Sequence, residues 1–249
     1  MVGPLTADLR RRVGRRRGSA WTWSAASAVA VLAVLAVAVT GRGGAEPGTP
    51  GPAADVPALV GASGTVGPVV ALGDSLTADT TTDGGPRYWS WYTAALADEP
   101  RLLDAGNAGT PGDTTTGMLD RFDRDVAVHE PRVVVVLGGT NDLVVGRSAD
   151  DVLGTLEQLA AEVRAIDAVP VLATVPPRTD GDFTEQVREL NAAIRGYGER
   201  SGTRVLDFSS VLADDDGGWR PGRTDDGVHP TRAGAAAMGR LAVQELFRG

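Results

Sequence analysis

The sequence predicts an α/β domain in which a parallel sheet is covered by helices on both faces. Short apolar runs typical of buried strands alternate with longer segments of helical periodicity. The region with this pattern, residues 67–249, has the length of a single domain. Strands that alternate with helices favour parallel pairing through right-handed crossovers, so we expect three layers, α/β/α.

Five segments are expected to form buried strands. Each is short, rich in valine, leucine or alanine, and followed by glycine or polar residues. They cover residues 68–73, 101–107, 132–139, 169–175 and 203–208.

Five segments favour helices. The clearest covers residues 148–166, where apolar residues recur on one face and Ser148 with Asp151 resembles a capping box. Asp182 is the candidate N-cap of a second helix. Further helices are expected over residues 231–247, 88–97 and 114–123.

The N-terminal region has the pattern of a membrane segment. Six arginines lie between Arg10 and Arg17, and residues 21–40 carry no charge. A chargeless stretch of this length can cross a bilayer, and flanking arginines keep residues 1–20 in the cytoplasm. Trp21 and Trp23 would lie at the membrane interface.

Two alternatives to a retained anchor remain. The segment could be a signal peptide cleaved after the small residues Ala36–Ala38, or, less favoured because of the six arginines, a buried core helix. Both leading interpretations place the rest of the chain beyond the membrane, either anchored by one span or secreted. Residues 41–66 are rich in Gly, Pro and Ala and are expected to form a linker, so the folded domain would cover residues 67–249.

The charge of the chain is segregated. All 24 basic residues are arginine, and the net charge is −8. Seven arginines and three acids precede residue 67, which gives +4 there and −12 for the remainder. Since nucleic-acid binding needs a cationic face, the acidic body argues against such a partner. The absence of cysteine excludes disulfides, thiol catalysis and cysteine-ligated zinc.

Polar residues follow several of the predicted strands. Ser75 lies in "GDSLT", Gly112 in "NAGTPGDTT", Asn141 in "GGTND", and Asp226 and His229 lie in "DGVHPT". In an open parallel sheet, ligands bind at the carboxyl ends of the strands, where these loops would meet. A hydroxyl, flexible backbone amides, a side-chain amide, a carboxylate and an imidazole are together the groups that acyl transfer requires.

The residue types fit that chemistry. A serine hydroxyl needs an adjacent base, and imidazole suits this role at neutral pH. His229 is the candidate base and Asp226 its partner, whereas His129 precedes a strand at the opposite edge and is expected to be an exposed loop residue. Taken singly, each site residue could equally be a turn or cap residue.

The four blocks resemble the GDSL, or SGNH, hydrolase superfamily over most of residues 68–246. The resemblance implies a flavodoxin-like, five-stranded sheet of order 2-1-3-4-5. It also implies that Ser75 is the nucleophile, that Asp226 and His229 complete the triad, and that Ser75, Gly112 and Asn141 form the oxyanion hole.

Other motifs point to no different chemistry. The sequence has no G-x-S-x-G and no H-E-x-x-H, and the acidic residues 213–218 lack the spacing of a calcium loop. The aromatic residues in "GGPRYWSWY", 84–92, could line a substrate pocket or form the core face of the first helix.

We therefore expect an extracytoplasmic serine esterase that requires no cofactor or metal and acts on a small-molecule, glycan or lipid ester. The alternatives are a carbohydrate O-acetylesterase and a non-catalytic wall-binding module. The sequence does not indicate the substrate-binding residues or the oligomeric state.

Overall fold

The computed structural model describes residues 58–79 and 88–248, and they form the predicted α/β fold. Five parallel strands lie in the order β2-β1-β3-β4-β5, which confirms the order that the resemblance implied. The strands are β1 (Val66–Gly73), β2 (Leu102–Gly109), β3 (Val133–Leu137), β4 (Val169–Ala173) and β5 (Arg204–Leu206).

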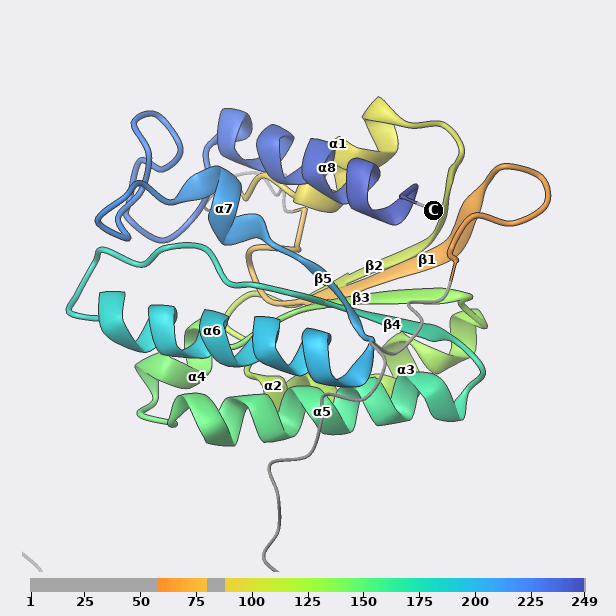
Figure 1. Cartoon of the computed structure of the whole chain (residues 1–249), viewed down its shortest axis with the longest axis horizontal. Coiled ribbons are helices and arrows are strands. Elements are labelled where there is room, and N and C mark those ends of the chain that lie inside the picture. Colours follow the sequence, from red (N-terminus) through yellow and green to blue (C-terminus); the bar gives the residue numbers. More distant parts are fainter. Residues whose placement is uncertain (1–57, 80–87, 249) are drawn as a thin grey trace, which may run out of the picture. The chain divides into compact units, whose positions relative to one another are not determined.

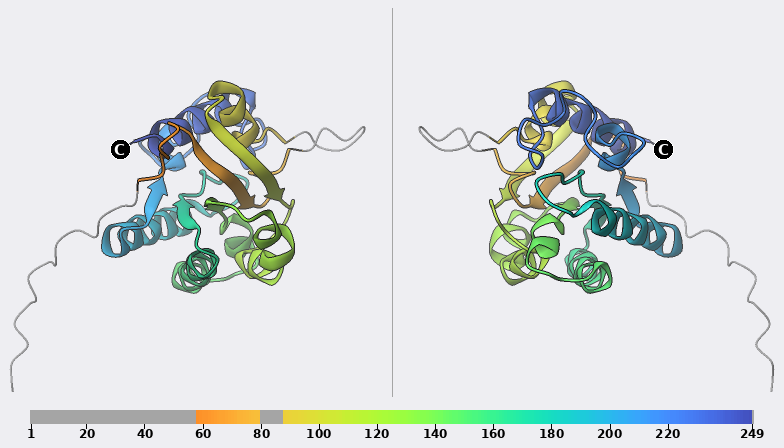
Figure 2. Two further views of the ribbon diagram at one scale, coloured as in Figure 1. Left: turned by 90° about the vertical axis from the view of Figure 1, so that its right-hand side faces the viewer. Right: turned by 90° about the vertical axis from the view of Figure 1, so that its left-hand side faces the viewer.

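Helices cover both faces of the sheet (Figures 1 and 2). One face carries α1 (Trp91–Asp98), α7 (Phe208–Leu212) and α8 (Arg232–Leu246). The other carries α2 (Thr115–Asp120), α3 (Phe122–Asp125), α4 (Thr140–Val144), α5 (Ala149–Ala165) and α6 (Thr184–Ser201). A 3₁₀ helix, η1 (Ala127–His129), precedes β3.

The core lies on both sides of the central strands. All five residues of β3 are buried, as expected for a parallel strand covered on two faces. The largest side chains in the core are Trp91 and Tyr92 of α1 and Phe208 of α7, and the rings of Trp91 and Phe208 lie 5.2 Å apart. This aromatic cluster fixes α1 and α7 against one face of the sheet.

Strands β2, β1 and β3, which are neighbours in the sheet, end at the same level. Gly73, the last residue of β1, pairs with Gly109 of β2 on one side and with Leu137 of β3 on the other. The loops that follow these strands therefore emerge together at one edge of the sheet.

The helix boundaries differ from the prediction in three places. The segment predicted as one helix over residues 114–123 is divided into α2 and α3 at Arg121, whose ψ of 6° departs from helical geometry. Helix α6 starts at Thr184 after Phe183, so Asp182 is not its N-cap. Helices α4 and α7 were not predicted. The predicted cap Ser148 of α5 is confirmed, since its side chain accepts a hydrogen bond from the N–H of Asp151. Thr231 caps α8 in the same way, by accepting from the N–H of Gly234.

The fold includes residues that the sequence assigned to the linker. Leu59 is only 1% exposed, and Val60 forms an antiparallel bridge with Val66. The folded part thus includes residues before the predicted boundary at Gly67. The predicted membrane segment, residues 21–40, lies outside the described residues, and none of the described helices is long and apolar enough to cross a bilayer.

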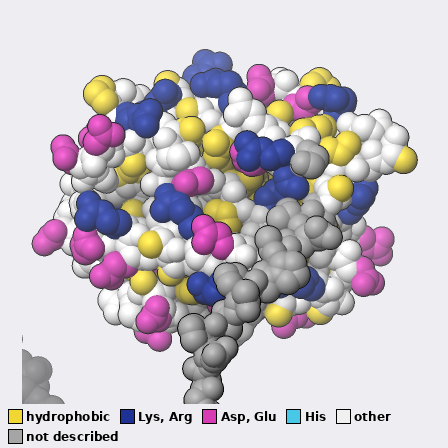
Figure 3. Space-filling model, in the orientation of Figure 1, with side chains coloured by type: hydrophobic (Ala, Val, Ile, Leu, Met, Phe, Trp, Pro, Cys, Tyr) yellow, Lys and Arg dark blue, Asp and Glu magenta, His cyan; other side chains and the backbone are white. Residues whose placement is uncertain are grey.

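Charges of both signs are interspersed on the face that Figure 3 shows. Arginine and acidic side chains alternate there, with small apolar patches between them. In α6, Arg188 pairs with Glu185 at 2.6 Å. This face has the mixed character of an ordinary solvated protein surface.

Candidate active site

Ser75 lies in a tight turn just beyond the end of β1. Thr77 and Ala78 each donate a backbone hydrogen bond to the carbonyl of Asp74, at 3.1 and 3.0 Å. Glycine is needed at position 73 because a Cβ there would lie 2.2 Å from Thr77 Oγ1 and 2.8 Å from the carbonyl oxygen of Leu137. The turn can therefore close tightly on the strand, and Ser75 stays 8% exposed at the edge of the sheet.

His229 and Asp226 reach Ser75 from the loop that precedes α8. Ser75 Oγ lies 2.9 Å from His229 Nε2, and His229 Nδ1 lies 2.7 Å from Asp226 Oδ2. The three side chains are thus connected in the order hydroxyl, imidazole and carboxylate. In the tautomer that carries its proton on Nδ1, His229 donates to Asp226 and leaves Nε2 free to accept the proton of Ser75.

The loop itself holds the carboxylate of Asp226. The backbone N–H groups of Val228 and His229 donate to Asp226 Oδ1 at 2.8 and 2.7 Å. Partial burial raises the pKa of Asp226, but these two bonds and the bond and charge of the His229 ring outweigh it and lower the pKa to about 2. Asp226 is therefore a carboxylate at any pH near neutrality.

Asn141 and the loop containing Gly112 also lie at the carboxyl ends of the strands, close to Ser75. Asn141, in the first turn of α4, donates from Nδ2 to the carbonyl oxygen of Asp113 at 2.8 Å and to Asp74 Oδ2 at 3.3 Å. Gly112 precedes Asp113 and has a φ of +80°, with no atom within 4 Å of the position of a Cβ. Glycine is therefore required at position 112 by the positive φ, since there is room for a larger side chain.

The structure therefore brings four predicted residues into direct or one-step contact. Ser75, His229 and Asp226 are directly connected, and Asn141 contacts Asp74, the neighbour of Ser75. Gly112 is connected to Asn141 only through the adjacent carbonyl of Asp113.

Asp74, which directly precedes Ser75 in the chain, is fully buried. Burial raises its pKa to about 7; the hydrogen bond from the Leu76 N–H, at 2.9 Å, opposes this shift, and the charges of Asp113 and Asp142 add to it. The ionisation of a carboxyl group next to Ser75 therefore occurs near neutral pH.

Several polar residues around the site were not singled out from the sequence. Asp142 accepts hydrogen bonds from the N–H and hydroxyl of Thr115, at 2.9 and 2.7 Å, and from Arg147, at 2.5 Å. Arg121 is 7% exposed and lies between α2 and α3. Asp142 directly follows Asn141 in "GGTND", so the motif contained a signal for it, whereas nothing near Arg121 in the sequence marks its side chain as buried.

The aromatic residues of segment 84–92 were expected either to line a substrate pocket or to form the core face of the first helix, and the described ones fall into both groups. Trp91 and Tyr92 are buried in the core, whereas the ring of Tyr88 lies 4.6 Å from that of His229. Trp89 lies against the guanidinium of Arg232, at 5.5 Å. Residues 84–87 lie outside the described part of the chain.

His129 is exposed in η1, immediately before β3, as predicted. Within residues 58–79 and 88–248, no group of three or more histidine and acidic side chains is arranged to hold a metal ion. The side chain of Asp214, in the acidic segment 213–218, accepts from the backbone of Asp216 and Gly218, at 3.1 and 2.8 Å.

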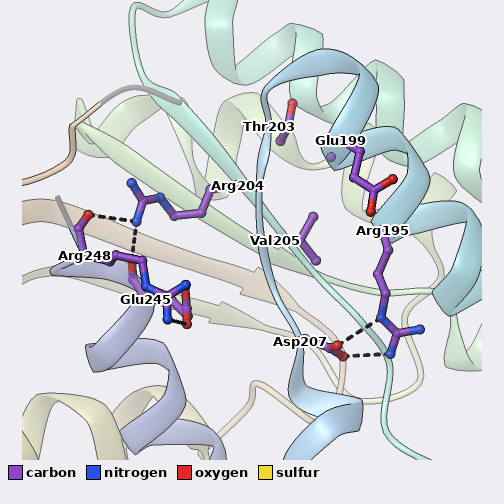
Figure 4. A pocket seen from close by; sticks show the side chains of 9 residues that line it. Arg195, Glu199, Thr203, Arg204, Val205, Asp207, Glu245 and Arg248 are labelled. Carbon is purple, nitrogen blue, oxygen red and sulfur yellow. Dashed lines mark hydrogen bonds and ion pairs between the residues drawn. The ribbon is translucent and has the colours of Figure 1, made fainter. Parts of the chain in front are cut away.

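A cavity of about 530 Å³ lies beside the edge strand β5 (Figure 4). Arg195 forms two hydrogen bonds with Asp207 there, at 2.9 and 2.8 Å, and Arg248 pairs with Glu245 at 2.9 Å. None of the five predicted site residues lines this cavity. It is separate from the Ser75 centre.

Comparison with known proteins agrees with the geometry. Residues 71–237 match the GDSL-like lipase/acylhydrolase family. The chain is 27% identical to esterase TesA of Pseudomonas aeruginosa over 167 residues, which covers 66% of this chain and 80% of that protein. It is 28% identical to thioesterase 1/protease 1/lysophospholipase L1 of Escherichia coli over 173 residues, covering 66% and 76% of the two chains.

The fold is also found among solved structures. A GDSL-like lipase from Bacteroides thetaiotaomicron superimposes with a TM-score of 0.59 at 24% identity, covering 72% of this chain and 86% of the other. The family match runs from β1 into α8 and includes all five predicted site residues. The chain therefore belongs to the GDSL-like lipase/acylhydrolase family and is a hydrolase that acts on ester bonds.

Proposed function

We propose that this protein is an extracytoplasmic serine esterase that hydrolyses carboxylic esters through an acyl-enzyme on Ser75. The observation that carries the proposal is the connected series from Ser75 Oγ to His229 Nε2, at 2.9 Å, and from His229 Nδ1 to Asp226 Oδ2, at 2.7 Å. This spacing lets one proton move from the hydroxyl to the imidazole as the ester is attacked.

In the first half of the reaction, His229 takes the proton of Ser75 while Oγ bonds to the ester carbonyl carbon. Asp226 stabilises the imidazolium that forms. The carbonyl oxygen becomes an oxyanion, which we assign to the backbone N–H groups of Ser75 and Gly112 and to Asn141 Nδ2. Asn141 Nδ2 would exchange its long, 3.3 Å bond to Asp74 Oδ2 for the oxyanion and keep the bond to the carbonyl of Asp113. When the intermediate collapses, His229 returns the proton to the departing alcohol and an acyl-enzyme remains.

In the second half, His229 takes a proton from water, and the resulting hydroxide attacks the acyl carbon. The same donors stabilise the second oxyanion. Collapse breaks the bond to Ser75 Oγ, which regains its proton from His229, and the carboxylic acid leaves. The net reaction consumes one ester and one water.

A Ser75→Ala variant tests the proposal. Because it removes the nucleophile and little volume, we expect turnover of a short-chain aryl ester to fall at least about 1000-fold with an unchanged near-UV circular dichroism spectrum. Labelling by a fluorophosphonate probe should disappear in the same variant, which separates a hydrolase from a non-catalytic binding module. Ser63→Ala, which removes an exposed hydroxyl bonded to Thr65, is the matched control and should keep full activity. Normal turnover in purified Ser75→Ala would refute the assignment.

The substrate class is proposed from the relatives. Their names describe an esterase and a thioesterase/lysophospholipase, which supports an acyl ester of a lipid or small alcohol. A panel of acyl esters of graded chain length and of acetylated glycans measures this preference. Faster turnover of acetylated glycans would instead support the carbohydrate O-acetylesterase.

We also propose that residues 58–249 lie beyond the cytoplasmic membrane. Six arginines before an uncharged stretch, residues 21–40, support this orientation. The residues on which it depends lie outside the described part of the chain.

A further inference from the structure

The guanidinium of Arg121 lies beneath the loops that carry the proposed oxyanion donors. Its side chain is only 8% exposed, and it is placed where α2 ends and α3 begins. A buried arginine is uncommon unless its N–H groups are satisfied. Its partners therefore indicate what it holds in place.

Two of these partners belong to the oxyanion loops. Arg121 Nη2 donates to the carbonyl oxygen of Gly73 at 2.9 Å, and Nε donates to Asp113 Oδ2 at 2.7 Å. Gly73 is the last residue of β1, two residues before Ser75, and Asp113 directly follows Gly112. One side chain thus connects the segments that carry the first two donors.

The third donor is connected through the same aspartate. The carbonyl oxygen of Asp113 accepts the hydrogen bond from Asn141 Nδ2 at 2.8 Å. A displacement of Asp113 would therefore move both the N–H of Gly112 and the amide of Asn141 relative to Ser75.

A third bond anchors the guanidinium itself. Arg121 Nη1 pairs with Asp125 Oδ2 of α3 at 3.2 Å. A planar guanidinium can satisfy three acceptors in fixed directions, whereas the ammonium of lysine is a point charge on a flexible stem. The three bonds to Gly73, Asp113 and Asp125 therefore depend on the fixed donor directions of an arginine guanidinium, which lysine lacks.

We propose that Arg121 is a positioning residue that holds the three oxyanion donors in register, and this inference rests on the proposed acyl-enzyme mechanism. Donors stabilise an oxyanion only when they are aimed in advance at the place where it forms. Loss of Arg121 should accordingly raise the barrier of the chemical step and leave substrate binding largely intact.

The test compares Arg121→Gln and Arg121→Lys with Arg124→Gln. Arg124 lies in α3, the short helix that begins directly after Arg121, is 75% exposed and pairs with Asp125, so it is a matched control for the loss of an arginine charge. For a short-chain aryl ester, we expect Arg121→Gln to lower kcat by roughly 10 to 100-fold, because one oxyanion donor is worth about 100 to 1000-fold. KM should change by less than about threefold, Arg121→Lys should lie between the wild type and Arg121→Gln, and Arg124→Gln should match the wild type.

A double variant separates positioning from general stability. If Arg121 acts through the oxyanion donors, Arg121→Gln should lower kcat by a smaller factor in the Asn141→Ala background, where one of the three donors is already absent, than in the wild type. Equal losses in both backgrounds would overturn the proposal, and so would a normal kcat in folded Arg121→Gln.

Two further variants, Asp113→Asn and Ser75→Ala, separate a failure to fold and a failure of the proposed mechanism from a failure of the role of Arg121. If Arg121→Gln does not fold, Asp113→Asn replaces it, since this change removes the charged partner and keeps the backbone carbonyl; a normal kcat there overturns the inference. Activity in Ser75→Ala would refute the mechanism as a whole, whereas an inactive Ser75→Ala with a fully active Arg121→Gln would refute the role of Arg121 alone.

Discussion

At the scale of single residues, Asp74 faces opposing influences. Its Oδ1 accepts the N–H of Leu76 at 2.9 Å and its Oδ2 lies 3.3 Å from Asn141 Nδ2, both of which favour the carboxylate. Burial and the neighbouring carboxylates favour the protonated form and raise the pKa to about 7. The folded protein therefore holds a proton here that the unfolded chain releases near pH 4.

This difference predicts how stability depends on pH. Between about pH 4 and pH 7 the folded state binds more protons at Asp74 than the unfolded state, so this group makes the free energy of unfolding decrease as pH rises. The contribution is at most one proton, or about 1.4 kcal/mol per pH unit. In Asp74→Asn it should vanish, and urea unfolding at four values between about pH 4.5 and pH 8 measures the difference in slope.

The exposed Asp120→Asn is the control for this experiment and should keep the wild-type slope. Parallel curves for the wild type and Asp74→Asn would show that Asp74 ionises in the folded protein as it does in the unfolded chain.

The sequence singled out the five predicted site residues because each lies in a short motif directly after a strand or before a helix. Motif spacing and the topology together determined where Ser75 and His229 meet. Arg121 could not be found in this way, because its proposed role depends on the break between α2 and α3, which brings its guanidinium to the carbonyl oxygen of Gly73. Helix propensity indicates whether a segment is helical, but it does not determine the direction of a single side chain.

At the scale of elements, the position of His229 depends on the contact between α1 and α8. Gly239 of α8 faces the backbone of α1, where a Cβ would lie 2.8 Å from the amide nitrogen of Ala95 and 3.0 Å from the carbonyl oxygen of Trp91. Backbone atoms of a helix cannot rotate away as a side chain can. The close approach of the two helices therefore requires glycine.

Gly239→Ala should destabilise the protein by about 1 to 3 kcal/mol, because overpacking outweighs the gain in helix propensity of about 1 kcal/mol. Since α8 starts three residues after His229, its displacement should also lower kcat. Gly154→Ala in the middle of α5 is the matched control: no atom lies within 4 Å of the added methyl group, and we expect a gain of about 0.5 to 1 kcal/mol. Urea unfolding measures both changes, and a stabilised Gly239→Ala would contradict the packing argument.

The elements that the sequence predicted well are the long or strongly periodic ones. Helix α5 has 17 residues and keeps one buried face, and the valine-rich β3 is buried along its whole length. Helices α4 and α7 have five residues each, too few to show a helical period. They form where the chain leaves a strand and packs against neighbours that are distant in sequence.

At the scale of the whole molecule, charge is divided between the two ends of the chain. Residues 1–66 carry +4 and the remainder carries −12. The net negative charge of residues 67–249 is compatible with a domain on either side of the membrane, so this net charge does not indicate where the domain lies. The proposed orientation rests on the six arginines that precede residues 21–40.

The full chain, expressed in a bacterial host with a C-terminal epitope tag, tests this orientation. We expect the tag to be accessible to protease outside the cytoplasmic membrane, either on a membrane-bound chain of full mass or on a released chain that begins after Ala38. The control carries Leu32→Arg and Leu35→Arg, each costing about 2.5 to 3.5 kcal/mol at the centre of a membrane helix, and should keep the tag inside. A wild-type chain recovered from the cytoplasm with residues 1–40 intact would contradict the proposal, because the arginine flank and the uncharged stretch would then direct no export.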